Sequence, residues 1–351
     1  MNNQSSKKHF VDVAKRYNRP EPLIEEIEQY AAKLIDAALP VLFSPLHLSL
    51  TMGVKLEKYN EVVKNRLGYY EEFNLKKKNG GFRQINAPKG ELLNYQRWVK
   101  TYILDQLQFP SYLTAYQKGK SIADNARAHA KQPLIIKFDL QDFYGHISQD
   151  KVFGMFKILG YGTAIAIDLA KICCMPGLID GEKETNLAYL PQGAPTSPAI
   201  SNFAAGRMDR RLLEYAKRTG FNYTRYADDL TFSGPLKSTF HKGMVEQIIS
   251  DEGFTVNQRK TRFVPSSANQ LVTGLNVNHR AVVPKKMRRM VHTHLHNCLR
   301  SGPYQNLESI GMSKKMNYND WLLGHINYIR ILHPFEAAKM MEKYNKINWI
   351  Q

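Results

Sequence analysis

The sequence predicts an α+β protein in which short antiparallel hairpins stand between long helical segments. Three observations predict this fold class. Two adjacent acids, Asp228 and Asp229, stand between short runs of β-forming residues, which indicates a hairpin that turns at the acids. The run 134–144 is apolar and β-branched after Pro133, which indicates a strand covered on at least one face. Apolar residues also recur at helical spacing near both ends of the chain.

The composition predicts a soluble protein with a polyanionic partner. The 351 residues are 43% hydrophobic, which is enough for a sizeable core, and 49 Lys and Arg against 31 Asp and Glu leave a net charge of +18. The three cysteines follow no disulfide or zinc spacing, which fits a reducing compartment. The first residues lack the apolar run of a signal peptide, and no segment approaches the roughly 18 apolar residues of a membrane span. We therefore expect a cytoplasmic protein with no membrane partner.

The N-terminal part predicts helices followed by a basic hairpin. Residues 10–40 and about 46–59 have helical patterns, and two strand-like runs then flank Asn79-Gly80-Gly81, a strong turn signal. Basic residues stand on both sides of this turn: Lys76, Lys77, Lys78, Arg83 and Lys89. A guanidinium beside a basic turn can fork onto phosphate oxygens. The alternative is a solvated hairpin tip.

Two further segments have two interpretations each. Residues 121–130 predict a short helix with Ser121 as its N-cap, on which Asn125 and His129 share one face. That face is either a structural contact or a functional one. Residues 188–202 predict a Gly/Pro loop, containing Gln192, that enters a helix at Pro198. Such a loop either brings backbone N–H groups close to a nucleotide or is a plain connector.

Carboxylates end two of the predicted strands. Asp139 follows a buried run, and a buried carboxylate needs a cation or another partner. A turn at Asp228 and Asp229 places two more carboxylates at a sheet edge, where Mg²⁺ can collect oxygen ligands. An ordinary Asp-containing turn is the alternative for the second pair.

The C-terminal third predicts helices, one of them strongly basic. A helix over about 239–250 precedes a hairpin edge at 271–277, and a basic helix covers 284–300. Residues 319–345 add two more helical pieces. The side chains expected to follow a nucleic-acid backbone are Lys285, Lys286, Arg288 and Arg289.

The order of these parts resembles the reverse transcriptases. Asp139 on a strand, the Gln192 loop and then Tyr226-Ala227-Asp228-Asp229 on a hairpin resemble their palm, and the basic hairpin with Arg83 resembles their fingers. Lys260 resembles their following motif, and residues 324–328 resemble part of their thumb. Asn125-Ala126-Arg127-Ala128-His129 is similar to the Asn-Ala-x-x-His signature of bacterial retron reverse transcriptases, and Val272-Thr273-Gly274 is similar to their Val-Thr-Gly signature.

The resemblance implies a right-hand polymerase architecture. Its expected parts are an N-terminal helical region over 1–64, fingers over 65–130, a palm of antiparallel sheet on helices over 131–278, and a helical thumb with a C-terminal RNA-binding region over 279–351. It also implies an RNA-directed DNA polymerase that copies a cognate structured non-coding RNA into branched RNA–DNA. Priming from the 2′-hydroxyl of an internal guanosine, and an effector protein in defence against phage, are further implications.

The same resemblance implies roles for individual residues. Asp139 and Asp228 are expected to hold two Mg²⁺ ions, with Asp229 in support and the Leu140 carbonyl as a further ligand. The residues expected to contact the incoming deoxynucleoside triphosphate are Lys76, Lys78, Arg83, Tyr144, Gln192 and Lys260. Tyr144 would exclude a 2′-hydroxyl, and a core aromatic is the alternative. The residues expected near RNA or a partner are Asn125, His129, Lys285, Lys286, Arg288 and Arg289.

Two other functions compete with this interpretation. One is another bacterial reverse transcriptase, of a diversity-generating, abortive-infection or group II intron-derived lineage, against which the two retron signatures argue. The other is a palm-fold RNA-binding protein without polymerase activity. The presence of Asp139, Asp228 and Asp229 argues against it, because RNA binding has no need of clustered acids.

Overall fold

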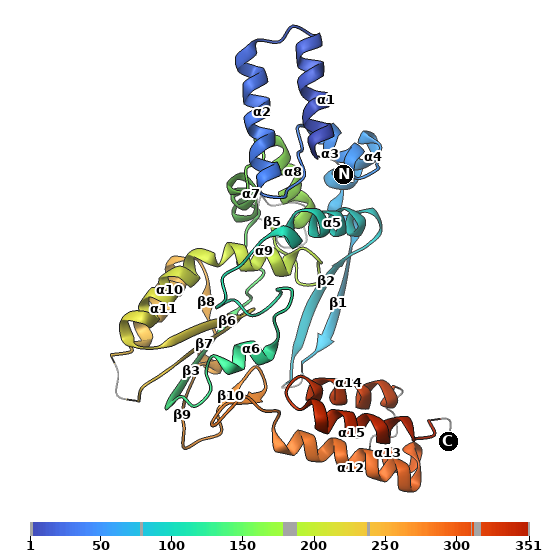
Figure 1. The fold of residues 1–351 in the computed structure, drawn as a ribbon, viewed down its shortest axis with the longest axis vertical. Coiled ribbons are helices and arrows are strands. Elements are labelled where there is room, and N and C mark those ends of the chain that lie inside the picture. Colours follow the sequence, from blue (N-terminus) through green and yellow to red (C-terminus); the bar gives the residue numbers. More distant parts are fainter. Residues whose placement is uncertain are drawn as a thin grey trace. The chain divides into compact units, whose positions relative to one another are not determined.

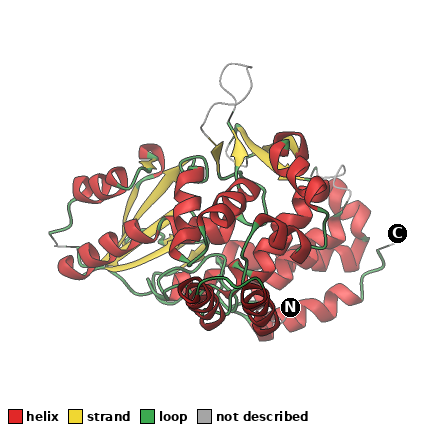
Figure 2. Cartoon of the chain, turned by 90° about the horizontal axis from the view of Figure 1, so that it is seen from above, coloured by secondary structure: helices red, strands yellow, loops and turns green. Residues whose placement is uncertain are grey.

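The computed structural model describes residues 3–77, 80–177, 188–236, 239–309, 311 and 317–349. The chain divides into two compact units, each assembled from three segments of sequence. Unit 1 comprises residues 1–117, 140–212 and 241–257, and unit 2 comprises residues 118–139, 213–240 and 258–351. Figure 2 shows the helices in red and the strands, most of them short, in yellow.

The described helices are α1 (Asn3–Arg16), α2 (Glu21–Asp36), α3 (Pro45–Thr51), α4 (Leu56–Lys64), α5 (Gly90–Tyr102), α6 (Ile122–Arg127), α7 (Gln149–Ile158), α8 (Thr163–Cys173), α9 (Ser197–Ala204), α10 (Gly206–Thr219), α11 (Lys242–Asp251), α12 (Lys285–Ser301), α13 (Pro303–Ser309), α14 (Tyr318–Arg330) and α15 (Pro334–Asn345). Short 3₁₀ turns are η1 (Arg66–Tyr69), η2 (Leu104–Gln106) and η3 (Gln258–Lys260).

The described strands are β1 (Tyr70–Lys76), β2 (Phe82–Pro88), β3 (Leu134–Gln141), β4 (Met175–Pro176), β5 (Ala188–Tyr189), β6 (Asn222–Tyr226), β7 (Asp229–Gly234), β8 (Thr255–Val256), β9 (Arg262–Pro265), β10 (Leu271–Val272) and β11 (Leu275–Asn276). The prediction of an α+β protein with short antiparallel hairpins is confirmed: β1 pairs with β2, β6 with β7 and β10 with β11, all antiparallel.

The helical pattern over residues 10–40 contains a break that the sequence analysis did not predict. The structure has two helices there, α1 and α2, because Asn18 adopts a left-handed backbone with φ 47° and Pro20 is the N-cap of α2. The stretch at 46–59 is likewise divided into α3 and α4, with Gly53 at φ 74° between them. Ser121 caps α6 as predicted, in a capping box with Asp124.

Unit 1 is built around helices α4, α5 and α8. Their buried side chains include Tyr59, Val99 and Leu169, and the Tyr59 hydroxyl donates to the Asp168 carboxylate at 3.0 Å. Burial raises the pKa of Asp168. Because a buried carboxylate is costly without a partner, this bond fixes α4 against α8 as well as satisfying the acid.

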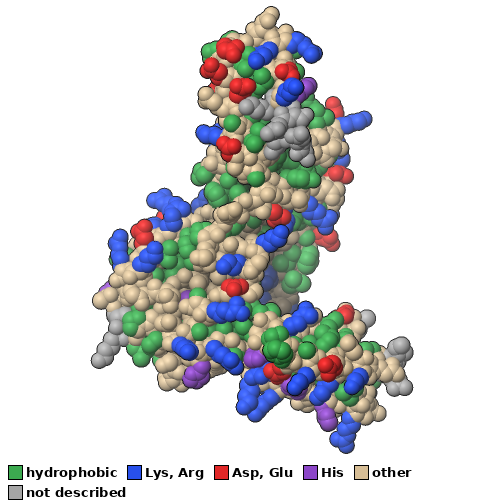
Figure 3. All heavy atoms as spheres, viewed as in Figure 1, with side chains coloured by type: hydrophobic (Ala, Val, Ile, Leu, Met, Phe, Trp, Pro, Cys, Tyr) green, Lys and Arg blue, Asp and Glu red, His purple; other side chains and the backbone are tan. Residues whose placement is uncertain are grey.

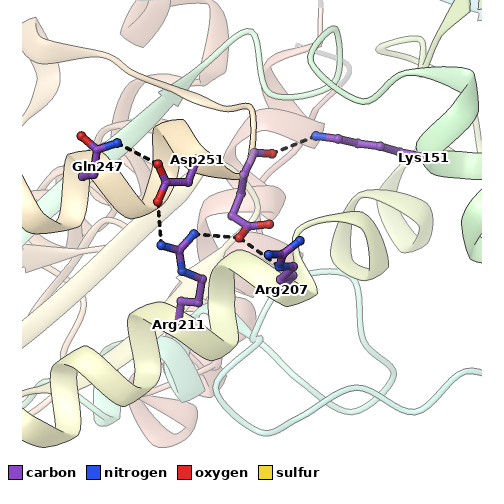
Figure 4. A network of polar contacts seen from close by, with 6 residues as sticks. Lys151, Arg207, Arg211, Gln247 and Asp251 are labelled. Atoms are coloured by element: carbon purple, nitrogen blue, oxygen red, sulfur yellow. Dashed lines mark hydrogen bonds and ion pairs between the residues drawn. The ribbon is translucent and has the colours of Figure 1, made fainter.

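A polar network in unit 1 joins the start of α10 to the end of α11 (Figure 4). The Arg211 guanidinium contacts Asp251 at 2.7 Å and Glu252 at 2.9 Å, and Arg207 approaches Glu252 at 3.3 Å. Lys151 of α7 donates to the Glu252 carbonyl at 2.9 Å. These contacts fasten the turn that leads from α11 into β8.

The largest sheet is organised on β3. This strand pairs antiparallel with β7 on one side and with β9 and β8 on the other, and β6 lies outside β7. The chain passes from unit 2 to unit 1 between Asp139 and Leu140, so the last two residues of β3 pair with β8 within unit 1. The sheet therefore positions Asp139 at the end of the unit 2 part of the strand.

The two faces of the sheet formed by β3, β6 and β7 differ in chemistry, because side chains alternate along a strand. One face carries aromatic rings that pack together: Phe138 lies 6.0 Å from Phe232, and Phe232 lies 4.9 Å from Tyr223 and 5.3 Å from Phe240. The other face, here called the polar face, carries Lys137, Asp139, Thr224, Asp229, Thr231 and Ser233. Helix α6 lies beside β6 (Figure 1).

Helices α12 to α15 belong to a core cluster of unit 2 that also includes Ile135 of β3 and Ala123 and Ala126 of α6. Their fully buried residues include Leu295, Leu322, Ile326 and Met340, and the β10–β11 hairpin adds Val272 and Leu275 to the same cluster. Within the described residues, no helix combines the length and the apolar character that crossing a membrane requires.

Candidate active site

The acidic hairpin has a two-residue loop. Tyr226 pairs with Asp229, so only Ala227 and Asp228 lie between β6 and β7. Ala227 has φ 57°, and a positive φ at the first loop residue is the pattern of a type II′ turn. The buried guanidinium of Arg225 donates to the Ala227 carbonyl at 3.0 Å and holds this turn. The predicted hairpin is confirmed, but its loop is formed by Ala227 and Asp228, and Asp229 is already the first residue of β7. The role of Arg225 was not predicted.

Asp139 and Asp229 are direct cross-strand partners. They stand opposite each other in the β3–β7 ladder, so both side chains lie on the polar face. Like charges in this position destabilise a sheet unless a cation compensates them. Sheet register thus brings Asp229, which lies 90 positions later in the chain, opposite Asp139. Asp139 is only 7% exposed, which increases the need for a compensating charge.

Two lysines of unit 2 supply part of that charge. Lys260 contacts Asp139 at 2.8 Å, and this hydrogen bond raises the pKa of the Lys260 ammonium. Lys137, two residues before Asp139 on the same face, attracts the negative charge of Asp229. Sequence reasoning did not single out Lys137, although the period of two along a strand would have identified it.

The remaining charge in the cluster is negative. Burial raises the pKa of Asp228, and the charges of Asp229 and Asp139 raise it further. Burial also raises the pKa of Asp229, while Lys137 opposes that shift. Carboxylates destabilised by burial and by one another are suited to bind a hard cation such as Mg²⁺.

These carboxylates are therefore chemically suited to bind magnesium, although their side chains do not already form a metal site. Over the described ranges, no three His, Cys, Asp or Glu side chains lie close enough together to hold a metal ion. The acids that fit the role are Asp139, Asp228 and Asp229. Leu140, whose carbonyl was a predicted ligand, pairs with Val256 of β8.

Unit 1 contains a pocket of about 220 Å³. The pocket is lined by residues of β2, the turn after β3, β5 and the loop after β5. These residues are Gln84, Asn86, Asp142, Tyr144, Gly145, Tyr189, Leu190 and Gln192. The pocket thus joins two predicted nucleotide-contacting residues, Tyr144 and Gln192. It also includes Asn86 and Tyr189, which sequence reasoning missed because no motif marks them.

The Gln192 loop is attached closely to β2. The Asn86 N–H donates to the Gln192 carbonyl at 2.8 Å. The next residue, Gly193, has φ 125°, and a Cβ there would stand 2.8 Å from Ile85 Cγ2 and 3.1 Å from the Asn86 carbonyl oxygen. Only glycine permits both this backbone conformation and this approach. The predicted loop therefore forms one wall of the pocket.

The basic side chains of the β1–β2 hairpin lie outside that pocket. Lys76 and Arg83 are exposed, and neither lines the cavity. Arg83 alternates along β2 with Gln84, so the two side chains leave opposite faces of the hairpin. Lys78, also predicted to contact the triphosphate, lies outside the described residues.

Asn125 and His129 are buried in unit 2, at 1% and 0% exposure. The Thr224 hydroxyl donates to Asn125 Oδ1 at 2.5 Å, which uses its single hydrogen. His129 Nε2 therefore donates to Thr224 Oγ1 at 2.7 Å, and Nδ1 accepts from the Ser233 hydroxyl at 2.7 Å. We call these four residues the hydroxyl network.

The hydroxyl network lies on the polar face, on the strands that carry Asp229. Side chains with almost no exposed area have no surface to offer RNA or a protein, so their burial argues against the predicted direct contact. Of the two interpretations of this helix face, the structure favours the structural one. The network fastens α6 to β6 and β7.

The basic side chains of α12 have two different environments. Lys285, Lys286 and Arg289 are exposed, whereas Arg288 is half-buried and pairs with Glu336 of α15 at 2.7 Å. Figure 3 shows Lys and Arg side chains along the C-terminal helices at the bottom of the view and over the rest of the drawn face. The exposed three are thus available to phosphates, whereas Arg288 already holds a carboxylate.

The comparisons with known proteins agree with this geometry. Residues 75–277 match the family model for reverse transcriptase (RNA-dependent DNA polymerase). The Mx65 retron reverse transcriptase of Myxococcus xanthus is 31% identical over 89% of this chain and 74% of that protein. The Ec86 retron reverse transcriptase of Escherichia coli is 33% identical over 71% of this chain and 76% of that protein. The Mx162 enzyme of M. xanthus is 33% identical over 71% of this chain and 56% of that protein.

A solved structure of telomerase from Candida albicans aligns with 83% of this chain and with 67% of the telomerase chain. The TM-score is 0.41 and the sequence identity is 14%, which is too low to support an argument about fold or function. The family match covers more than half of the chain and includes both strands with the opposed acids. The fold is accordingly that of the right-hand polymerases, and the chain belongs to the retron reverse transcriptases, a family of RNA-directed DNA polymerases.

Proposed function

We propose that this polymerase copies a cognate structured non-coding RNA into DNA that remains joined to the RNA by a branch. Synthesis starts from the 2′-hydroxyl of an internal guanosine, and the enzyme acts with an effector protein in defence against phage. The substrates are deoxynucleoside triphosphates, and the compartment is the cytoplasm. The named similarity to retron reverse transcriptases over most of the chain is the observation that carries this proposal.

Asp139 and Asp229 of the polar face, with Asp228 of the adjoining turn, supply the chemistry of phosphoryl transfer, which depends on positioning and on neutralised charge. Asp139 and Asp228 would hold two Mg²⁺ ions, with Asp229 and the Leu140 carbonyl in support. Such ions would supply Lewis-acid activation of the attacking hydroxyl and charge stabilisation at the leaving pyrophosphate. Lys260 stays protonated, because its contact with Asp139 raises its pKa, and it assists the leaving group.

The pocket of unit 1 receives the incoming nucleotide. The half-buried Tyr144 ring lines this cavity, where it excludes a sugar 2′-hydroxyl, and Gln192 contacts the nucleotide or the template. Lys76, Lys78 and Arg83 bind the triphosphate from the fingers hairpin. In this proposal the chain comprises an N-terminal helical region (1–64), fingers (65–130), palm (131–278) and thumb (279–351).

The RNA is held by exposed cations of the thumb. Lys285, Lys286 and Arg289 follow the phosphates, and the +18 net charge of the chain favours a long polyanionic partner. Asn125 and His129 act on this complex indirectly, since the hydroxyl network supports the hairpin that carries Asp228 and Asp229.

Expression with the native flanking DNA tests the proposal. The protein is purified, its nucleic acid is extracted, and samples are treated with RNase, with DNase and with a debranching enzyme. Asp228→Asn is the matched control, because it changes one carboxylate oxygen to an amide. We expect a DNA strand that is attached to RNA, is released by debranching and is absent from the Asp228→Asn sample.

Other results would identify the competing functions. DNA without a branch would indicate a reverse transcriptase of a diversity-generating, abortive-infection or group II intron-derived lineage. RNA without DNA, together with no incorporation by the purified protein on a primed RNA template, would indicate a palm-fold RNA-binding protein without polymerase activity.

A further inference from the structure

The Tyr144 side chain has a partner that lies outside the pocket. The hydroxyl oxygens of Tyr116 and Tyr144 are 2.9 Å apart, so they share a hydrogen bond within unit 1. A ring that excludes a 2′-hydroxyl must stay in one rotamer, because rotation about χ1 would move it away from the sugar. A hydrogen bond at the far end of the ring opposes that rotation.

Tyr116 itself sits on a constrained segment. Its φ is 60°, an uncommon backbone conformation for a bulky aromatic residue and one that persists only where the surroundings enforce it. The preceding residues, Leu113, Thr114 and Ala115, are buried. The buried Asn202 amide of α9 donates to the Ala115 carbonyl at 2.9 Å. The Tyr116 ring therefore projects from a fixed point.

The turn that carries Tyr144 is constrained as well. Asp142 has φ 42°, and its carbonyl accepts from His146 Nδ1 at 2.9 Å. Phe143 is buried and packs on Phe254 at 5.5 Å. A Cβ on Gly145 would stand 2.2 Å from an Asp142 carboxylate oxygen, so the Asp142 side chain packs closely over the glycine. The hydroxyl pair thus connects two segments that are each held by their own contacts.

We propose that Tyr116 is a positioning residue that holds Tyr144 in the rotamer that rejects ribonucleoside triphosphates. This inference rests on the proposed role of Tyr144 as the sugar-discriminating ring. Tyr116 does not line the pocket, so it acts through Tyr144 and not by contact with substrate. It determines specificity for the sugar without taking part in phosphoryl transfer.

The test measures discrimination with the purified full-length chain on a primed RNA template. kcat/KM is determined for one deoxynucleoside triphosphate and for the matching ribonucleoside triphosphate. Tyr116→Phe removes the hydroxyl and keeps the ring, and Tyr144→Phe removes the same hydrogen bond from its other end. Tyr102→Phe is the matched control, since Tyr102 has a similar exposure of 47% against 46% for Tyr116.

We expect Tyr116→Phe to lower the deoxy-to-ribo ratio about three- to tenfold, the range of one hydrogen bond. Tyr144→Phe should lower it by the same factor, and the double variant should lower it no further, because both changes remove one interaction. Tyr102→Phe should leave the ratio unchanged. A merely structural role for Tyr116 would reduce both efficiencies together and leave the ratio unchanged.

Tyr144→Ala separates failure of this inference from failure of the proposed gate. Lost discrimination in Tyr144→Ala with an unchanged ratio in Tyr116→Phe would keep the gate and overturn the role of Tyr116. A wild-type enzyme that uses both sugars equally would overturn the gate and this inference together. A wild-type protein that incorporates neither nucleotide would overturn both as well.

Discussion

Lowering the pH should destabilise the β6–β7 hairpin, because His129 is buried against it. Burial lowers the pKa of this side chain from 6.5 to about 3, so the folded protein keeps it neutral at mildly acidic pH. An unfolded chain takes up the proton below about pH 6.5. Between roughly pH 3 and 6.5 the unfolded state therefore binds more protons, and stability falls as the pH falls through this window.

The magnitude follows from the width of the window. Each pH unit within it is equivalent to ~1.4 kcal/mol, and pH 5 lies about 1.5 units below the unfolded pKa, which gives ~2 kcal/mol. Amide hydrogen exchange of β6 and β7, corrected for the intrinsic rate at each pH, reports the local opening free energy. We expect that free energy to fall by ~2 kcal/mol more in the wild type than in His129→Gln between pH 7 and pH 5, because glutamine does not titrate.

An equal fall in both proteins would refute the reasoning, since it would mean that His129 gains its proton in the folded state. A second measurement does not depend on the variant. The ring proton signals of His129 should not shift between pH 7 and pH 5 in the wild type, whereas an exposed histidine titrates with a pKa near 6.5. Movement of those signals would contradict the buried hydroxyl network directly.

Three further predictions concern the pocket and the thumb. Gly193→Ala should raise KM for the deoxynucleotide roughly tenfold, because the new Cβ would stand 2.8 Å from Ile85 Cγ2 on a backbone of φ 125°. Gly243→Ala on α11, with open space around the new Cβ, is the control for steady-state kinetics and should be neutral. Replacing Lys285, Lys286 and Arg289 together by Ala should reduce the slope of log K against log salt for RNA binding by roughly 2 to 3, whereas an unchanged slope would place the phosphates elsewhere. Arg288→Gln should change that slope little and lower the melting temperature instead, since it leaves the half-buried Glu336 without its 2.7 Å partner.

Sequence reasoning predicted the parts of the site that local patterns encode. The turn at Asp228 and the strand ending at Asp139 follow from alternation and from turn chemistry, and the ladder then places Asp229 opposite Asp139. The α+β fold and the retron family are confirmed on the same residues. Local patterns sufficed because each of these elements is specified by neighbours in the sequence.

Contacts between distant segments were not predictable in this way. His129 bonds to hydroxyls 95 and 104 positions away, so its burial could not be inferred from a helix face. Tyr116 meets Tyr144 across 28 positions, and Arg288 meets Glu336 across 48. A guanidinium on a basic helix has the same local pattern whether it faces phosphate or a carboxylate of the neighbouring helix.

The hydroxyl network also affects how the β6–β7 hairpin finds its pairing. If the whole β6–β7 hairpin slipped by one residue against β3, the Thr224 and Ser233 side chains would move to the aromatic face. Asp229 would then no longer stand opposite Asp139. Each buried hydroxyl left without a partner would cost about 1–3 kcal/mol. A hairpin in the wrong register therefore forms neither the network nor the acidic cluster. A chain that has formed the hydroxyl network during folding therefore already has the acidic cluster in the correct arrangement.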